Sequence, residues 1–196
     1  MGYLNREDKT TEEMDEDGWM HSGDLGTLDH EGFLHIKGRK KELIVTAGGE
    51  NVAPVPMENN IKHELPAISN AIVIGDQRKF VSAFLTFKVE MDNDSPTNRL
   101  TPAAIEWCSS YGCDATTVDD ILQGPRSQPV TQIMAAIQSG IDQANKAAVS
   151  NAAKVKRWSI LPTDMSIPGG ELGPTLKLKR FFFNQKYAEA IEKLYQ

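Results

Sequence analysis

The stretches AIVIG at residues 71–75 and VSAFLTFKV at residues 81–89 decide the fold of this chain. Both are short and dominated by apolar, β-branched or aromatic residues, and the second alternates apolar with polar side chains. This pattern is typical of strands that bury one face. The sequence therefore predicts two strands here, and the other elements are placed outward from them.

Helices are predicted on both sides of these strands. A helix is expected at 54–65, opened by a proline in its first turn, and Thr101-Pro102 starts another with threonine as its cap. A final amphipathic helix is expected at 179–195. The longest helix is expected at 130–154, because its apolar residues recur every three or four positions on one face: Ile133, Ile137, Ile141 and Ala144.

Further strands and turns complete the pattern. GFLHIKG at 32–38 alternates between two glycines and predicts a half-buried strand. Short strands are also expected at 43–46 and 155–161, and 47–51 is a glycine-containing turn. The segment 91–101 is predicted to be a linker or loop. Together these elements indicate an α+β domain preceded by a short segment that belongs to another unit.

The composition is that of a globular chain. With 40% hydrophobic and 24% charged residues, it has enough apolar material for a core, and general disorder is excluded. No apolar run approaches the roughly 18 residues of a membrane span. The polar, acidic start differs from signal and transit peptides, and two cysteines make neither a disulfide framework nor a paired zinc motif. We therefore expect a cytoplasmic protein.

The net charge of −6 is distributed unevenly along the chain. Residues 1–31 hold ten acidic and two basic side chains, whereas the remainder holds 17 acidic and 19 basic ones. This balance does not predict a broad basic face, so we expect no nucleic-acid partner. Basic clusters remain at 39–41 and 177–180.

Taken one at a time, Asp24, Arg39 and Lys177 have ordinary explanations. Asp24 lies in a His-Ser-Gly-Asp turn, where a carboxylate either accepts hydrogen bonds from a ribose diol or caps the turn. Arg39 offers a rigid fork to a phosphate or ribose, yet a single arginine is more often a solvated surface residue. Lys177 lies in a Gly/Pro-rich segment, where it either delivers charge to a phosphate or aids solubility.

The order and spacing of the motifs favour the functional interpretation. Four motifs of the ANL adenylating superfamily resemble segments of this chain, in the same order: GWMHSGDLG (18–26), GFLHIKGRKKELI (32–44), GGENVAP (48–54, with Glu58) and GELGPTLKLKR (170–180). The superfamily contains acyl-CoA synthetases, firefly-type luciferases and nonribosomal peptide adenylation domains. The last motif, the opening MGYL and the segment 92–154 are most similar to the C-terminal part of bubblegum-type long-chain fatty acyl-CoA synthetases. A luciferase or a peptide-adenylating domain is therefore less favoured.

This resemblance implies a fold and a domain organisation. The fold is α+β, with a small mixed sheet flanked by helices. Residues 1–38 correspond to the end of a large N-terminal AMP-binding domain. Residues 39–196 correspond to the mobile C-terminal domain, with a long insertion at about 92–154.

The resemblance also implies the site residues. Asp24 matches the aspartate that holds the ribose hydroxyls of ATP and of the acyl-adenylate, and Arg39 matches an arginine that contacts the nucleotide. Lys41 falls at the hinge about which the C-terminal domain rotates between half-reactions. The loop with Gly48 and Gly49 matches the segment that lines the route of the CoA thiol. Lys177 matches the catalytic lysine that reaches the carboxylate and the α-phosphate.

The implied reaction is the ATP-dependent ligation of a long-chain fatty acid to CoA. A fatty carboxylate attacks ATP poorly because both are anions, and a lysine ammonium between them neutralises the developing charge. A hinge then withdraws the lysine, so that one site serves a second transition state. ATP with Mg²⁺ and CoA as co-substrate are expected, the Mg²⁺ held mainly by the N-terminal domain. No metal site is expected in this chain, whose four histidines lack the H-E-x-x-H spacing.

Departures from the family keep alternatives open. Gly173 stands where this subfamily typically has threonine, which predicts a looser loop around Lys177. The phosphate loop, adenine-binding segment and acyl tunnel are missing, so we expect a truncated product, an isoform or a partial gene model that is inactive alone. The alternative is a non-catalytic module that docks on a full-length synthetase or an N-terminal domain and regulates it.

Membrane contact is a second open point. Phe181-Phe182-Phe183, beside Lys179 and Arg180, either insert into a membrane surface or pack against the sheet as the first residues of a helix. Packing is favoured. Peripheral attachment to the endoplasmic reticulum or another membrane stays an alternative to a purely cytoplasmic location.

Overall fold

The computed structural model describes residues 2–123 and 128–196. The chain divides into two compact units, Met1–Leu43 and Ile44–Gln196, and each is described by itself. The division falls between Leu43 and Ile44, whereas the sequence predicts a domain boundary between residues 38 and 39. That boundary, which follows from the resemblance and not from compactness, stays a prediction.

The first unit consists of a helix and a two-stranded ribbon. Helix α1 (Glu7–Glu13) precedes the antiparallel strands β1 (Asp24–Leu28) and β2 (Leu34–Arg39), and a 3₁₀ turn, η1 (Lys40–Glu42), follows. The predicted strand at 32–38 is therefore confirmed. The prediction that it is half-buried is wrong within this unit, where Leu34 and Ile36 are 62% and 61% exposed. The reason is the shortage of apolar partners, since no described hydrophobic residue before Ile44 is buried.

A three-stranded mixed sheet forms the centre of the second unit. Its strands are β5 (Ile68–Ile74), β6 (Val81–Phe87) and β9 (Val155–Ile160), in the order β5-β6-β9. Strand β6 pairs with β5 in antiparallel fashion and with β9 in parallel. The predicted α+β fold with a small mixed sheet is therefore confirmed.

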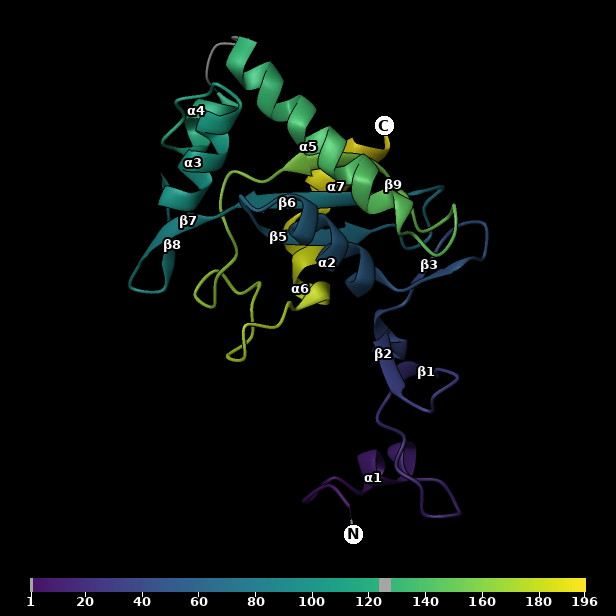
Figure 1. Cartoon of the computed structure of the whole chain (residues 1–196). Coiled ribbons are helices and arrows are strands. Elements are labelled where there is room, and N and C mark those ends of the chain that lie inside the picture. Colours follow the sequence, from purple (N-terminus) through teal and green to yellow (C-terminus); the bar gives the residue numbers. More distant parts are fainter. Residues whose placement is uncertain (1, 124–127) are drawn as a thin grey trace. The chain divides into compact units, whose positions relative to one another are not determined.

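Helices cover both faces of this sheet (Figure 1). One face packs against α2 (Pro54–Glu64) and α5 (Gln128–Lys146) through a core that contains the four apolar residues predicted for the long helix. Gly140 allows α5 to approach α2 closely, because a Cβ there would lie 2.7 Å from Leu65 Cγ. The other face packs against α6 (Arg180–Lys186) and α7 (Ala188–Tyr195) through Phe84, Phe183 and their neighbours.

Alternation along β6 explains how one strand serves both faces. Val81, Ala83, Leu85 and Phe87 belong to the first core, whereas Phe84 belongs to the second. Successive side chains of a strand point to opposite sides of a sheet, so the odd positions face α2 and α5. All seven residues of β6 are buried, as expected for the central strand.

The segment 91–101 is not the loop that the sequence predicts. It belongs to a hairpin of β7 (Val89–Asp92) and β8 (Ser95–Leu100), whose turn residues Asn93 and Asp94 have φ values of 46° and 61°. Asparagine and aspartate tolerate this left-handed conformation, so a polar sequence rich in these residues makes a tight hairpin turn.

Two helices follow this hairpin. The predicted helix start at Thr101 is confirmed, since its hydroxyl accepts a hydrogen bond from Ala104 N at the start of α3 (Pro102–Ser110). A short helix, α4 (Val118–Leu122), was not predicted; it begins with a capping box between Thr117 and Asp120.

One predicted helix is shorter in the structure, and another is two separate helices. The long helix α5 ends at Lys146 and not at Lys154, because the side chain of Asn145 turns to the backbone of Val155. Its Oδ1 accepts from Val155 N at 2.8 Å and its Nδ2 donates to Val155 O at 2.9 Å. The predicted helix 179–195 is two helices, α6 and α7, which are separated at Tyr187.

The Phe181–Phe183 segment is divided in its environment. Phe183 is fully buried, with its ring 5.9 Å from that of Phe84, so packing against the sheet is confirmed for this residue. Phe181 is 77% exposed. No described helix is both long and apolar enough to cross a bilayer.

Candidate functional site

Asp24 and Arg39 are direct cross-strand partners in the β1–β2 ribbon. Their Cα atoms are paired in register, and Arg39 Nε lies 3.2 Å from Asp24 Oδ1. The side chains are 33% and 58% exposed, so both groups stay accessible. Gly23, at a φ of 74°, precedes Asp24, and its carbonyl accepts from Lys40 N at 2.8 Å. The ribbon thus presents a carboxylate and a guanidinium side by side, which suits a ligand with both hydroxyls and a phosphate.

Lys41 lies in η1, at the end of the first unit. Its Nζ is 3.4 Å from Glu12 Oε1 and 3.7 Å from Glu13 Oε1. The side chain is 74% exposed, so these contacts are weak. The boundary between the compact units follows shortly after it, between Leu43 and Ile44. The hinge role of Lys41 stays a prediction.

Gly48 and Gly49 lie in a tight turn between β3 (Ile44–Val45) and β4 (Asn51–Val52). Thr46 organises this turn: its amide donates to Glu50 O at 3.0 Å, its carbonyl accepts from Gly49 N at 2.8 Å, and its hydroxyl accepts from Glu50 N at 3.2 Å. Gly49 has a φ of 80°, which L side chains rarely adopt. The turn is therefore well defined while its glycines remain exposed.

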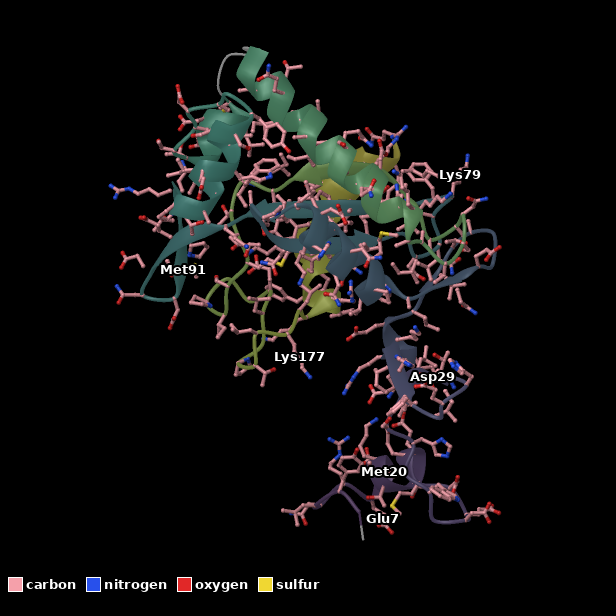
Figure 2. All side chains as sticks on the ribbon, in the orientation of Figure 1. Glu7, Met20, Asp29, Lys79, Met91 and Lys177 are labelled. Atoms are coloured by element: carbon pink, nitrogen blue, oxygen red, sulfur yellow. The ribbon has the colours of Figure 1, made fainter. Side chains whose placement is uncertain are left out.

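Lys177 lies on a closed loop between β9 and α6, and Figure 2 shows its side chain directed away from the sheet. Gly173 N donates to Lys177 O at 2.8 Å, and Leu176 N donates to Gly173 O at 2.8 Å. Leu176 adopts a φ of 58°, an uncommon value for a non-glycine residue. These contacts place Lys177 where it closes the turn of a small hairpin, opposite Gly173, with its side chain exposed.

The loop is anchored before Lys177 by Glu171, which is 1% exposed. Glu171 Oε1 accepts hydrogen bonds from Lys186 Nζ and, at 3.0 Å, from the hydroxyl of Tyr187. Burial by itself raises the pKa of Glu171, but the hydrogen bonds, with that from Lys186 foremost, outweigh it and hold the pKa below its ordinary value. Burial, and then the hydrogen bond to Glu171, raises the pKa of Tyr187.

The loop is anchored after Lys177 by Arg180. Its Nη2 lies 2.7 Å from each carboxylate oxygen of Glu58, and its Nη1 donates to Val73 O at 3.4 Å. Glu58 Oε1 also accepts from Val73 N at 2.9 Å. One ion pair therefore joins α2, β5 and the start of α6.

A looser loop around Lys177 stays a prediction. Gly173 takes part in both hydrogen bonds that close the loop, as donor to Lys177 O and as acceptor from Leu176 N. A Cβ at this position would meet Lys177 O at 3.6 Å and Lys179 Cε at 3.8 Å, which are ordinary contact distances. The position therefore has room for a Cβ.

The two anchors were missed from the sequence. Glu58 was recognised only as a member of a motif, and the roles of Glu171, Lys186 and Tyr187 were not predicted. A weak signal exists for Arg180, since an arginine at a helix start opposes the helix dipole and needs a carboxylate partner. The partner itself, 122 residues away, carries no local signal.

Other chemistry receives no support from the described residues. Within 2–123 and 128–196, no group of three His, Cys, Asp or Glu side chains converges on a metal site. Burial, with a smaller contribution from Cys113, raises the pKa of the Cys108 thiol to about 12, so this thiol is protonated at neutral pH. Both cysteines are free and buried.

Known proteins resemble this chain in sequence and in fold. Residues 41–107 match the family described as AMP-binding enzyme C-terminal domain. The whole chain is 52% identical, over 198 aligned residues, to the long-chain-fatty-acid–CoA ligase ACSBG2 of Xenopus laevis. This chain matches the C-terminal region of AMP-binding, adenylate-forming enzymes. The human long-chain-fatty-acid–CoA ligase ACSBG1 is also 52% identical over 198 residues.

The chain spans about a quarter of the length of these ligases, 26% and 27%, and matches their C-terminal region. Among solved structures, the adenylation domain of a carboxylate reductase from Mycobacterium chelonae matches 99% of this chain and 26% of its own, with a TM-score of 0.70 and 22% identity. The A domain of a carboxylic acid reductase from Segniliparus rugosus, in complex with AMP and a co-purified carboxylic acid, matches the same shares with a TM-score of 0.67 and 21% identity. These structures confirm the adenylate-forming fold.

The predicted site residues fall into two groups. Asp24, Arg39 and Lys41 lie in the first unit, where the structure brings Asp24 and Arg39 together. Gly48, Gly49 and Lys177 lie in the second unit, on two separate loops. Their roles stay predictions.

Proposed function

We propose that this chain is the C-terminal portion of a long-chain fatty acid–CoA ligase, which converts ATP, a long-chain fatty acid and CoA into acyl-CoA, AMP and pyrophosphate through an acyl-adenylate. The observation that supports this most directly is the 52% identity along the entire chain to ligases of that description. The presence of Asp24, Arg39 and Lys177 within the matching motifs adds to it.

Each residue receives a role in this proposal. The carboxylate of Asp24 accepts hydrogen bonds from the ribose hydroxyls, and the guanidinium of Arg39 beside it contacts the nucleotide. In adenylation, the ammonium of Lys177 lies between the fatty carboxylate and the α-phosphate and stabilises the charge that develops there. Rotation at Lys41 then withdraws Lys177 and presents the loop with Gly48 and Gly49 to CoA.

The support for Lys177 is its loop. Both sides are fixed by ion pairs whose carboxylates are buried, Glu171 with Lys186 and Glu58 with Arg180, while Lys177 itself is exposed. A rigid base under a free ammonium suits a group that acts on a substrate carried by another domain. ATP acts together with Mg²⁺ in this chemistry, and the described residues offer no cluster of three ligands for the ion.

The proposal is tested with a chimera in which this chain replaces the corresponding C-terminal quarter of the Xenopus laevis ligase. We expect the chimera to form long-chain acyl-CoA and release pyrophosphate, and the isolated chain to form none. A folded chimera that binds ATP but makes neither acyl-adenylate nor acyl-CoA would contradict the proposal. Acyl-CoA synthesis by the isolated chain would contradict its proposed dependence on an N-terminal domain.

A second function, a regulatory module without catalysis, is favoured by the apolar surface of the first unit. Exposed large side chains gather in this unit: Trp19, Met20, Leu28, Phe33, Leu34 and Ile36. Such a surface is typical of a segment that docks on another domain. If the isolated chain co-purifies at micromolar concentration with a full-length ligase and changes its rate, the module is supported. Absence of binding at that concentration argues against it.

Location and membrane contact belong to the same proposal. We propose a cytoplasmic enzyme whose exposed Phe181, next to Lys179, touches a membrane surface such as that of the endoplasmic reticulum. Sedimentation of the chain with anionic vesicles, compared with Phe181→Ser, tests this contact. Equal sedimentation of both proteins would argue against it.

A further inference from the structure

The root of the Gly48–Gly49 turn is fastened to the connection between β5 and β6. Val45 N donates to Asp76 Oδ1 at 3.0 Å, and Gln77 N donates to Val45 O at 2.8 Å. Ala47 N donates to Arg78 O at 2.9 Å. Strands β3 and β4 have two residues each, so these three hydrogen bonds are a large share of what fixes the turn.

The connection between β5 and β6 is itself a tight turn. Arg78 N donates to Gly75 O at 3.0 Å, and Gln77 adopts a φ of 56°. A non-glycine residue in the left-handed region costs free energy, so the turn persists only where other contacts hold it. In addition to the hydrogen bonds with Val45 and Ala47, such contacts come from the last helix of the chain.

Arg78 is the centre of these contacts. Its guanidinium pairs with the carboxylate of Glu192 in α7, with one contact at 3.2 Å, and lies 5.0 Å above the ring of Tyr195. The hydroxyl of Tyr195 donates to Ile74 O at 3.2 Å, and its ring lies 5.1 Å from that of Phe80. The end of α7 therefore contacts Arg78 itself and the residues before and after it, Ile74 and Phe80.

A second arginine secures the same helix end. Arg157 of β9 donates to Leu194 O at 2.8 Å and lies 5.4 Å above the ring of Phe80. The helix end is thus tied to the central sheet independently of Arg78. Loss of Arg78 is therefore expected to release the turn and not to unfold α7.

We propose that Arg78 is a positioning residue for thioester formation. Its contacts with α7 hold the β5–β6 turn in place, and this turn in turn holds the Gly48–Gly49 loop. The inference rests on the proposed function, in which this loop lines the route of the CoA thiol. Arg78 acts through backbone hydrogen bonds and its guanidinium is already engaged by α7. Its loss therefore affects the thioester step and leaves the Lys177 loop, elsewhere in the unit, in place.

The physical basis of the proposal is tested by amide hydrogen exchange in the 196-residue chain, which needs no activity. In Arg78→Ala, the amides of Val45, Ala47 and Gln77 are expected to exchange about fivefold faster, since the turn loses a half-exposed ion pair and a cation–π contact. The amide of Leu161, which donates to a carbonyl of β6 at 2.8 Å, is expected to keep its rate. Unchanged exchange at all three loop amides would overturn the proposal.

The functional consequence is tested in the chimera by following the two half-reactions separately. Arg78→Ala is expected to slow acyl-CoA formation from supplied acyl-adenylate about tenfold, and to leave pyrophosphate release within about twofold of the unaltered chimera. Glu192→Gln keeps the shape of α7. It is expected to change acyl-CoA formation and pyrophosphate release in the same direction as Arg78→Ala does, by smaller factors. Equal losses in the two half-reactions would show general destabilisation and overturn the positioning role.

A matched control uses a cation of α7, Lys193, which is next to Glu192 in the sequence. Lys193→Ala also removes one positive charge, from an exposed position of α7. We expect it to leave the exchange of the loop amides and both half-reactions unchanged. A wild-type chimera without activity would refute the proposed function and leave the exchange test of Arg78 intact, so the two failures are distinguishable.

Discussion

Arg180 and Glu58, which are 122 residues apart in the sequence, are joined by an ion pair in which one guanidinium nitrogen lies 2.7 Å from both carboxylate oxygens. The pair closes the loop that carries Lys177 against helix α2, and its side chains are 19% and 10% exposed. Because the carboxylate of Glu58 also accepts a hydrogen bond from Val73 N, it is held in place and restricts the side chain of Arg180. The position of the proposed catalytic lysine thus depends on residues from both ends of the second unit.

Breaking this pair is expected to cost stability. Glu58→Gln keeps the shape of the side chain but removes the charge opposite Arg180. The free energy of unfolding is expected to fall by about 2 kcal/mol, less than for a fully buried pair because both side chains retain some exposure. Urea denaturation of the chain measures the change. Glu189→Gln, on the exposed face of α7, is the control, and an equal effect of the two variants would contradict the assignment.

Lys177→Ala is expected to separate the two half-reactions in the opposite sense to Arg78→Ala. In the chimera, adenylate formation should fall about 100-fold, since the charge that stabilises the transition state is removed. Acyl-CoA formation from supplied acyl-adenylate should change little. The urea midpoint should stay the same, because the side chain is exposed. Equal losses in both half-reactions would contradict the proposed role.

Leu176 stores backbone strain next to Lys177. Its φ of 58° costs a residue with a Cβ roughly 1–2 kcal/mol, whereas glycine adopts it freely. Leu176→Gly is therefore expected to raise the free energy of unfolding by about 0.5 kcal/mol, after the larger chain entropy of glycine is subtracted. Leu176→Ala keeps the Cβ and is expected to give no such gain. Denaturation curves in which alanine and glycine are equivalent would show that the strain is absent.

The Glu171 anchor predicts a pH dependence with a definite sign. The pKa of Glu171 in the folded chain lies below its ordinary value of 4.5, so its hydrogen bonds contribute stability above that pH and lose it as the pH falls. The difference in unfolding free energy between the chain and Glu171→Gln is therefore expected to be largest near neutral pH and to shrink below about pH 4. Urea titrations at several pH values measure it. A difference that grows on acidification would contradict the assignment.

Much of the second unit could be predicted from local pattern. The strands at 71–75, 81–89 and 155–161 and the helix after Pro54 are all present, because alternation and apolar periodicity report which side chains face a core. The hairpin at Val89–Leu100 was missed because its exposed strands lack alternation and its turn is polar. The division of the last helix at Tyr187 was missed because the tyrosine hydroxyl turns to Glu171, a contact between separate elements.

The sequence by itself determined most strands and helices of the second unit, because their apolar periodicity is read along the chain. It also holds the adenylation motifs in their order, and through the family resemblance these motifs imply the residues proposed to act on nucleotide, acid and CoA. Only the tertiary structure decided what holds those residues. Three ion pairs do so: Glu58 with Arg180, Glu171 with Lys186, and Glu192 with Arg78. Charged pairs between distant elements carry no periodicity. They are fixed by the packing of both helix layers on one sheet, which brings together carboxylates and cations that the sequence keeps far apart.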